Sequence, residues 1–149
     1  MQAAKDTGGT VHILVNNAWG GETLCPVEDK PDTQLAHGLN VAFNGPFWAM
    51  QAAYPLMKAQ RWGRIINMCS LAGVNAFMGN VEYNSAKEAL RTLTCTVARE
   101  WAPFGIVANV ICPGAKGASL RRLFEPHPEM ERAMAAANPM RRIGDPRPI

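Results

Sequence analysis

The sequence lacks the features that mark membrane, secreted and nucleic-acid-binding proteins. The residues after Met1 have no apolar core of the signal-peptide type, and the longest apolar runs are far too short to cross a membrane. The formal net charge is only +3, and the basic residues are dispersed apart from a few arginines near the C-terminal end. We therefore expect a cytoplasmic protein that binds neither membranes nor nucleic acid.

Cysteine and histidine are also scarce, with four and three residues respectively. No Cys-x-x-Cys pair occurs, and no histidine lies at ligand-type spacing from a cysteine. Cys69 and Cys112 fall inside or at the end of apolar, strand-like runs, which favours small reduced core residues over disulfide or metal roles. We therefore predict no metal site.

What is present is an ordinary globular composition. The chain has 149 residues, 48% of them hydrophobic and 18% charged, which fits one domain and excludes a disordered tail or a fibrous rod. Short β-branched apolar runs alternate with longer stretches of helical period, a pattern typical of parallel strands joined by crossover helices. The predicted strands are residues 11–15, 64–69 and 106–111, and the predicted helices are residues 32–59 and 81–101.

This alternation predicts an α/β fold, a β-α-β-α-β portion of a Rossmann-like, doubly wound parallel sheet followed by a tail. The strands are nearly continuous in apolar character, which predicts burial on both faces of the sheet. Gly45–Pro46 is expected to bend or interrupt the first long helix, and Gly105 to end the second. In the Pro-rich tail only residues 129–137 have a helical pattern, and no charged pocket is evident there.

Tyr83 and Lys87 lie four residues apart near the start of the second long helix, so both side chains project from one helix face. Ser70 closes the preceding strand, on the rim of a parallel sheet where ligands bind. A hydroxyl donor beside a phenol suits a carbonyl or alcohol substrate, whose oxygen Ser70 would polarise while Tyr83 moves the proton. The alternatives are an exposed helix pair and, for Ser70, a helix cap.

Two further strand ends carry loop residues on the same predicted rim. Asn17 and Ala18 follow the first strand, where small and amide residues let the backbone approach a ligand closely. Pro113 and Gly114 form a rigid turn after the third strand. Each motif alone is more often structural than functional. Three strand ends that each carry such a motif on one rim nevertheless favour a binding site.

In combination these motifs resemble the short-chain dehydrogenase/reductase family. The motifs occur in the order and at the spacing of the family from about Val11 to Gly114. They are the Asn-Asn-Ala turn with Asn17 and Ala18, Asn40 in the first helix, the residues Ser70, Tyr83 and Lys87, and the Pro113–Gly114 turn.

The resemblance implies hydride transfer between NAD or NADP and a small carbonyl or alcohol substrate. The catalytic residues would be Asn40, Ser70, Tyr83 and Lys87. Tyr83 would be the acid/base and Ser70 would orient the substrate oxygen. Lys87 would lower the Tyr83 pKa and hold the nicotinamide ribose, and Asn40 would hold a water of the proton relay. The cofactor would contact Asn17, Ala18, Tyr83, Lys87, Pro113 and Gly114, and the full-length enzyme would be a homo-oligomer.

The sequence departs from the family pattern at several points, which include the absence of the closing helix and strand of the family after Pro146 and of its Thr at Ala118. It holds no Gly-rich phosphate-binding turn, and Trp19 stands where the Asn-Asn-Ala turn of the family continues with glycine. We therefore expect residues 1–149 to be a single incomplete NAD(P)-binding domain, truncated at both ends, with a core at 11–114 and a lid-like tail at 115–149. The alternative is an inactive fragment that acts, if at all, as a helix-mediated oligomerisation or interaction module.

Overall fold

The computed structural model describes residues 6, 8–20 and 24–147. The chain divides into two compact units, Met1–Cys112 and Pro113–Ile149. Each unit has its own internal contacts and is described by itself.

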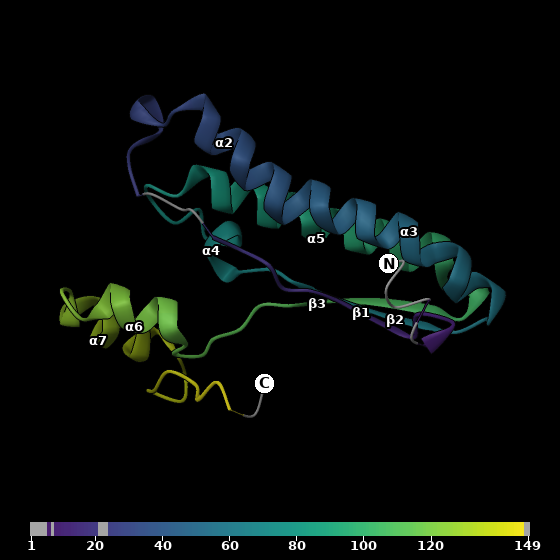
Figure 1. The fold of residues 1–149 in the computed structure, drawn as a ribbon. Coiled ribbons are helices and arrows are strands. Elements are labelled where there is room, and N and C mark those ends of the chain that lie inside the picture. Colours follow the sequence, from purple (N-terminus) through teal and green to yellow (C-terminus); the bar gives the residue numbers. More distant parts are fainter. Residues whose placement is uncertain (1–5, 7, 21–23, 148–149) are drawn as a thin grey trace. The chain divides into compact units, whose positions relative to one another are not determined.

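The first unit is built on a three-stranded parallel sheet (Figure 1). Strands β1 (Ile13–Asn16), β2 (Gly63–Met68) and β3 (Ile106–Ile111) lie in the order β1-β2-β3. Ile13 pairs with Arg64 across the first ladder, and Gly63 pairs with Ile106 across the second. Because parallel neighbours need long crossovers, a helical segment lies between each pair of strands. The predicted α/β fold with parallel strands is confirmed.

The first crossover is helical throughout but irregular in its middle. A short 3-10 turn (η1, Val27–Asp29) precedes α2 (Asp32–Leu39), which continues through a π-helical segment, η2 (Asn40–Asn44), into α3 (Gly45–Ala59). The Gly45 N–H donates to the Asn40 carbonyl, five residues back. Pro46 has no N–H to donate to the carbonyl of Ala42, so the regular ladder cannot run unbroken through this point. The interruption lies directly before Gly45–Pro46, where the sequence predicts it.

The second crossover combines a four-residue helix, α4 (Leu71–Val74), with the long helix α5 (Val81–Trp101) and a 3-10 turn, η3 (Ala102–Phe104). Gly105 follows with a φ of 74°, a left-handed conformation that glycine adopts without strain. A side chain there would also meet the Arg61 carbonyl oxygen at 2.2 Å. Gly105 therefore ends this helical segment, as predicted.

Helices α3 and α5 pack side by side on one face of the sheet (Figure 1), and the core lies between the helices and the strands. Its fully buried members come from both helices and from the central and third strands: Met50, Ala53, Met57, Ile65, Leu90 and Ile106. The other face carries side chains that are 58% exposed at Ile13, 53% at Val15 and 43% at Val107. The prediction of burial on both faces is therefore wrong for the described chain, because α3 and α5 both cover the same face.

Two of the cysteines lie in this core region, as the sequence predicts. Cys69 is buried directly after β2, and Cys112 is half-buried after β3. Burial raises the pKa of the Cys69 thiol to about 11, and it also raises the pKa of Cys112. Cys69 is therefore a neutral thiol near pH 7 and behaves as a small apolar side chain.

One polar side chain, that of Asn67 in β2, lies fully buried in the centre of this unit. Its Nδ2 donates to Thr94 Oγ1 of α5 at 2.8 Å, and its Oδ1 accepts from Asn16 Nδ2 of β1 at 2.7 Å. Thr94 Oγ1 in turn donates to the Leu90 carbonyl oxygen at 2.7 Å. These bonds satisfy the buried amide and tie the end of β1 and the middle of α5 to the central strand.

The second unit contains two helices, α6 (Ala118–Phe124) and α7 (Pro128–Ala137). The sequence predicts α7 but not α6, because α6 has only seven residues, too few for a clear period. Phe124 at its end is 3% exposed. A parallel bridge between Ala115 and Gly144 joins the start of the unit to its end. Among the described residues of the chain, no helix is long and apolar enough to span a bilayer.

We expect Asn67→Leu to lower the free energy of unfolding by about 2 kcal/mol, because the substitution removes the partner of Asn16 and Thr94 inside the core. Asn109→Leu is the matched control, since Asn109 is exposed on the neighbouring strand β3. It should change stability by less than about 0.5 kcal/mol. Urea unfolding followed by circular dichroism measures both, and equal losses in the two variants would show that the Asn67 bonds add nothing.

Candidate active site

The predicted catalytic side chains Ser70, Tyr83 and Lys87 lie around the C-terminal end of β2. Ser70 stands two residues after Met68, the last residue of β2. Tyr83 and Lys87 lie in the first two turns of α5, and Lys87 Nζ donates to the Met68 carbonyl oxygen at 2.7 Å. This bond fixes the start of α5 against the end of β2.

Lys87 is buried, with 3% of its surface exposed. Its Nζ lies 5.6 Å from the centre of the Tyr83 ring. Burying an ammonium is costly unless polar groups accept its hydrogen bonds, and the Met68 carbonyl supplies one such acceptor. The ammonium also lies within cation–π range of the Tyr83 ring.

The ring of Trp19 packs edge-on against the Tyr83 ring, with centroids 4.7 Å apart and planes at 66°. Lys87 Nζ lies 5.8 Å from the centre of the Trp19 ring. An aromatic pair in this arrangement gains free energy beyond that of area burial alone. The sequence marks Trp19 only as a large ring among small residues, and its contact with Tyr83 could not be read from that position.

The geometry of Ser70 shows a capping role and is compatible with the predicted catalytic one. Its extended backbone precedes α4, and its Oγ accepts the N–H of Ala72 at 3.1 Å, which makes it the N-cap of that helix. A hydroxyl that accepts one hydrogen bond keeps its own hydrogen for donation. The capping bond therefore orients Oγ without preventing it from donating to a substrate oxygen.

Asn40 begins the π-helical segment η2, which packs against α5. Its Oδ1 accepts a hydrogen bond from Asn44 Nδ2 at 2.7 Å, and the residue is exposed. π-Helical segments are rare and occur often at functional sites. The structure thus shows an irregular backbone at Asn40, and its relay role stays a prediction.

The residues predicted to contact a cofactor lie in both units. Asn17 and Ala18 are exposed directly after β1, whose last residue, Asn16, is tied to Asn67. Pro113 and Gly114 begin the second unit, where the Gly114 carbonyl accepts the N–H of Gly144 at 2.9 Å. The rim of the first unit therefore holds Asn17, Ala18, Tyr83 and Lys87, and the contribution of Pro113 and Gly114 stays a prediction. In the described ranges, no cluster of three or more His, Cys, Asp or Glu could hold a metal ion.

A buried ion pair beside the site was not predicted. Lys30 Nζ lies 2.7 Å from Glu82 Oε2, and both side chains are nearly inaccessible to water. Glu82 directly precedes Tyr83, and Gly38 of α2 packs so closely on it that a side chain there would lie 3.0 Å from the Glu82 Cβ. Burial acts to lower the pKa of Lys30, but the hydrogen bond and charge of Glu82 outweigh it and raise this pKa above its ordinary value. The pair ties the segment before α2 to the first turn of α5.

A parallel sheet covered by helices defines the class as an α/β protein, and Ser70, Tyr83 and Lys87 lie at the end of its central strand. The chain belongs to the short chain dehydrogenase family, whose model matches residues 1–127.

The individual comparisons agree with this assignment. An uncharacterized oxidoreductase of Bacillus subtilis (strain 168) is 43% identical over 106 residues, which cover 71% of this chain and 41% of the relative. A crystal structure of NAD+-bound xylitol dehydrogenase has a TM-score of 0.87 at 31% identity, over 97% of this chain and 61% of that one. A gluconate 5-dehydrogenase from Burkholderia cenocepacia J2315, in complex with NADP and tartrate, has a TM-score of 0.88 at 29% identity, over 97% and 56%.

The chain spans about half the length of the curated relatives that it matches, between 41% and 57% for the first three. The family and the fold are therefore established by the matched half.

We expect Glu82→Gln to lower the free energy of unfolding by about 2 kcal/mol, because it leaves the buried Lys30 ammonium without its charge partner. Glu88→Gln on the same helix is the control, since the Glu88–Arg91 pair is partly exposed and should contribute less than about 1 kcal/mol.

The double variant Lys30→Met/Glu82→Gln should recover part of the loss, because no charge is then buried without a partner. Denaturant unfolding of the three variants measures these differences. A loss for Glu82→Gln no larger than that for Glu88→Gln would contradict the structural role of the pair.

Proposed function

We propose that the protein transfers hydride between NAD or NADP and a small carbonyl or secondary alcohol substrate, with Tyr83 as the acid/base. The observation that carries the proposal is the position of Tyr83: its ring lies 5.6 Å from the buried Lys87 ammonium, which is hydrogen-bonded to the end of β2. Membership of the short chain dehydrogenase family supports this assignment. NAD+ and NADP in the two similar crystal structures support the cofactor class and leave the choice between them open.

The residues at the rim of the first unit fit a dinucleotide at its nicotinamide end. Lys87, held by the Met68 carbonyl, provides a cationic donor for ribose hydroxyl groups, and the exposed Asn17–Ala18 turn leaves backbone accessible beside it. A bound nicotinamide ring would supply the hydride donor or acceptor.

The side chains of this chain would handle the proton and the substrate oxygen. In reduction, the Tyr83 hydroxyl gives its proton to the carbonyl oxygen as the carbonyl carbon gains hydride, and in alcohol oxidation the phenolate takes the proton back. Ser70 Oγ donates a hydrogen bond to the same oxygen. The Lys87 ammonium stabilises the phenolate, and Asn40 would hold a water that returns the proton to solvent. Trp19 supports the Tyr83 ring from the side.

We expect Tyr83→Phe to lower kcat by about 100-fold or more in the whole protein, because only the transferable proton is lost. Cofactor affinity should change less than about threefold, since the ring and Lys87 remain. Tyr54→Phe is a matched control: Tyr54 packs against Trp101 and Phe104 at the far end of α5 from Tyr83. Turnover is measured with NADH and NADPH over a set of ketones, and with NAD+ and NADP+ over a set of secondary alcohols.

Activity of Tyr83→Phe within a few-fold of the parent would remove Tyr83 from the mechanism. For the control Tyr54→Phe, activity within a few-fold of the parent is the expected result. It would show that the loss of a phenol hydroxyl does not by itself damage the enzyme.

We also propose that the whole protein is a homo-oligomer that pairs through the outer faces of α3 and α5. A mainly apolar groove of about 290 Å³ lies between these helices, and its lining includes Phe47, Met50, Leu93 and Trp101. Trp48, which follows Phe47 on α3, is 58% exposed and would add a large apolar side chain to such a contact. The sequence suggests Ala86 and Ala89 as small residues for this contact, but Ala86 is fully buried in the core of its own chain and cannot serve.

We expect Trp48→Glu to convert the oligomer to a smaller species, because a carboxylate at the contact would lose water without gaining a partner. Met78→Glu is the control, since Met78 is 90% exposed in the segment before α5. Light scattering at micromolar concentration measures the mass of each variant. A parent protein that is already monomeric, or a Trp48→Glu variant of unchanged mass, would contradict this interface.

A further inference from the structure

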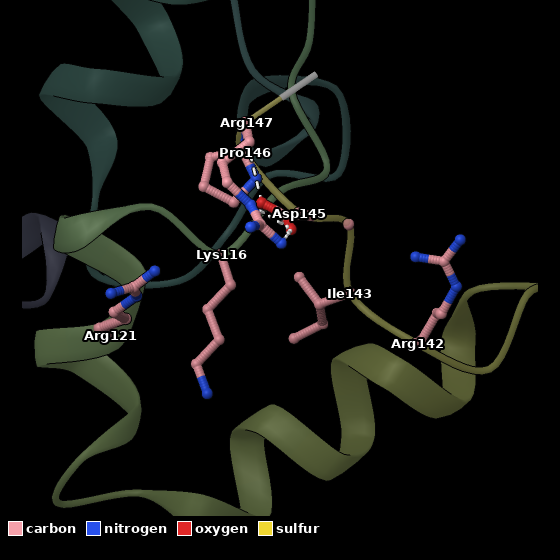
Figure 2. Close-up of a pocket in the computed structure, with 8 residues that line it drawn as sticks. Lys116, Arg121, Arg142, Ile143, Asp145, Pro146 and Arg147 are labelled. Atoms are coloured by element: carbon pink, nitrogen blue, oxygen red, sulfur yellow. Dashed lines mark hydrogen bonds and ion pairs between the residues drawn. The ribbon is translucent and has the colours of Figure 1, made fainter. Parts of the chain in front are cut away.

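The second unit contains a basic pocket that the catalytic proposal does not use. It has a volume of about 520 Å³ and lies among residues 116–147 (Figure 2). Its lining consists of Lys116, Arg121, Arg142, Ile143, Gly144, Asp145, Pro146 and Arg147. Sequence reasoning did not identify it, because Lys116 and Arg121 come from the start of the unit and the other residues from its end.

The charges of the pocket do not cancel. Arg147 Nε donates to Asp145 Oδ2 at 2.8 Å, and Lys116 Nζ pairs with Glu131 Oε1 at 2.5 Å. Within the part of the chain that the structure describes, Arg121 and Arg142 have no carboxylate within ion-pair distance. Two guanidinium charges therefore remain over the pocket after the internal pairs are counted.

The charges of Arg121 and Arg142 reach the same space. The pKa of Asp145 is lowered mainly by its hydrogen bonds with Arg147, and the positive charges of Arg121 and Arg142 lower it further. Figure 2 shows the two arginines on opposite sides of the pocket, with Lys116 and Ile143 between them. An anion near Asp145 is therefore within the field of both arginines.

Backbone hydrogen bonds hold the two halves of the pocket together. The Gly144 N–H donates to the Gly114 carbonyl and the Lys116 N–H donates to the Gly144 carbonyl, both at 2.9 Å. A side chain at position 144 would lie 2.9 Å from the Gly114 oxygen, so glycine is required for this close approach. Lys116 is thereby fixed beside Ile143 and Asp145, and the pocket does not depend on side-chain pairing alone.

We propose that this pocket binds the phosphate group of a small phosphomonoester. Arg121 and Arg142 both line the pocket, and the charge of each acts on a carboxylate in it, so a phosphate dianion gains about twice as much from their combined field as a monocarboxylate does. Each planar guanidinium can form two parallel hydrogen bonds to an oxyanion. The volume exceeds the needs of a phosphate ion, and Ile143 and Pro146 offer apolar contacts to the organic part.

The test uses the 149-residue chain and three probes: inorganic phosphate, glycerol 3-phosphate and acetate. Titration calorimetry should show saturable binding of both phosphates, with glycerol 3-phosphate at least as tight as inorganic phosphate and acetate at least about tenfold weaker. Arg121→Gln and Arg142→Gln should each weaken phosphate binding by about fivefold or more. Arg132→Gln, an exposed position on α7 outside the pocket lining, should change it less than about twofold.

Absence of saturable phosphate binding up to about 50 mM would overturn the proposal, since one charge-assisted site of this kind should bind more tightly. Acetate binding as tightly as phosphate would show a general anion site and would overturn the assignment to phosphate. If glycerol 3-phosphate bound more weakly than inorganic phosphate, the pocket would be a site for the free phosphate ion, and the assignment to a phosphomonoester would be overturned. Because Arg121 and Arg142 are exposed, their variants should keep the thermal unfolding curve of the parent, and binding is measured without turnover, independently of the catalytic proposal.

Discussion

The buried amide of Asn67 is the interaction on which the first unit depends most directly. It bonds to a side chain of β1 on one side and to a side chain of α5 on the other, and so joins both elements to β2. An amide buried in this way specifies geometry, because its donor and acceptor must each find a partner in a fixed direction. The ends of β1 and β2 are held in register by this constraint. The Asn67 bonds therefore also help to fix the positions of Asn17, which follows β1, and Ser70, which follows β2 closely.

The rigid layer of strands and helices then places the site residues that come from irregular backbone. Lys87 reaches the Met68 carbonyl because α5 is already packed on the sheet through Leu90 and Val97. Lys30 and Glu82 attach the first turn of α5 to the segment before α2. Tyr83 is thus held from three sides: by the helix that carries it, by the ion pair of its neighbour and by the ring of Trp19. A phenol that must hand over a proton at a fixed point benefits from such pre-organisation.

Most of the architecture could be predicted from the sequence, because it follows from local periodicity. The three strands, the two long helices, the break before Gly45 and the stop at Gly105 each correspond to a pattern within a few residues. Helix α6 was missed because seven residues give hardly two turns of period. The open face of the sheet was missed because an apolar strand looks the same whether or not a helix covers its second side.

Some features of the candidate site could likewise be predicted from the sequence, and others could not. Ser70, Tyr83 and Lys87 could be predicted to share a rim, since chain order and parallel strands place them there. The Lys30–Glu82 pair and the basic pocket could not, because each joins residues far apart in the sequence with no spacing rule between them. The sequence shows that Trp19 is a large ring where the turn of the family has glycine, but only the structure shows that this ring packs against Tyr83.

The π-helical segment Asn40–Asn44 sets the phase between two helices that would otherwise be one rod. Each residue of an α-helix turns the chain by about 100°, so one extra residue in the ladder rotates everything before it by that amount relative to everything after it. α2 packs against α5, where Gly38 touches Glu82, whereas α3 packs against β1 and β2. A deletion of one residue in this segment would remove its π-helical widening and turn Gly38 away from Glu82, although Pro46 would still leave one hydrogen bond of the ladder unmade. The length of this segment is therefore more constrained than the identity of most of its side chains.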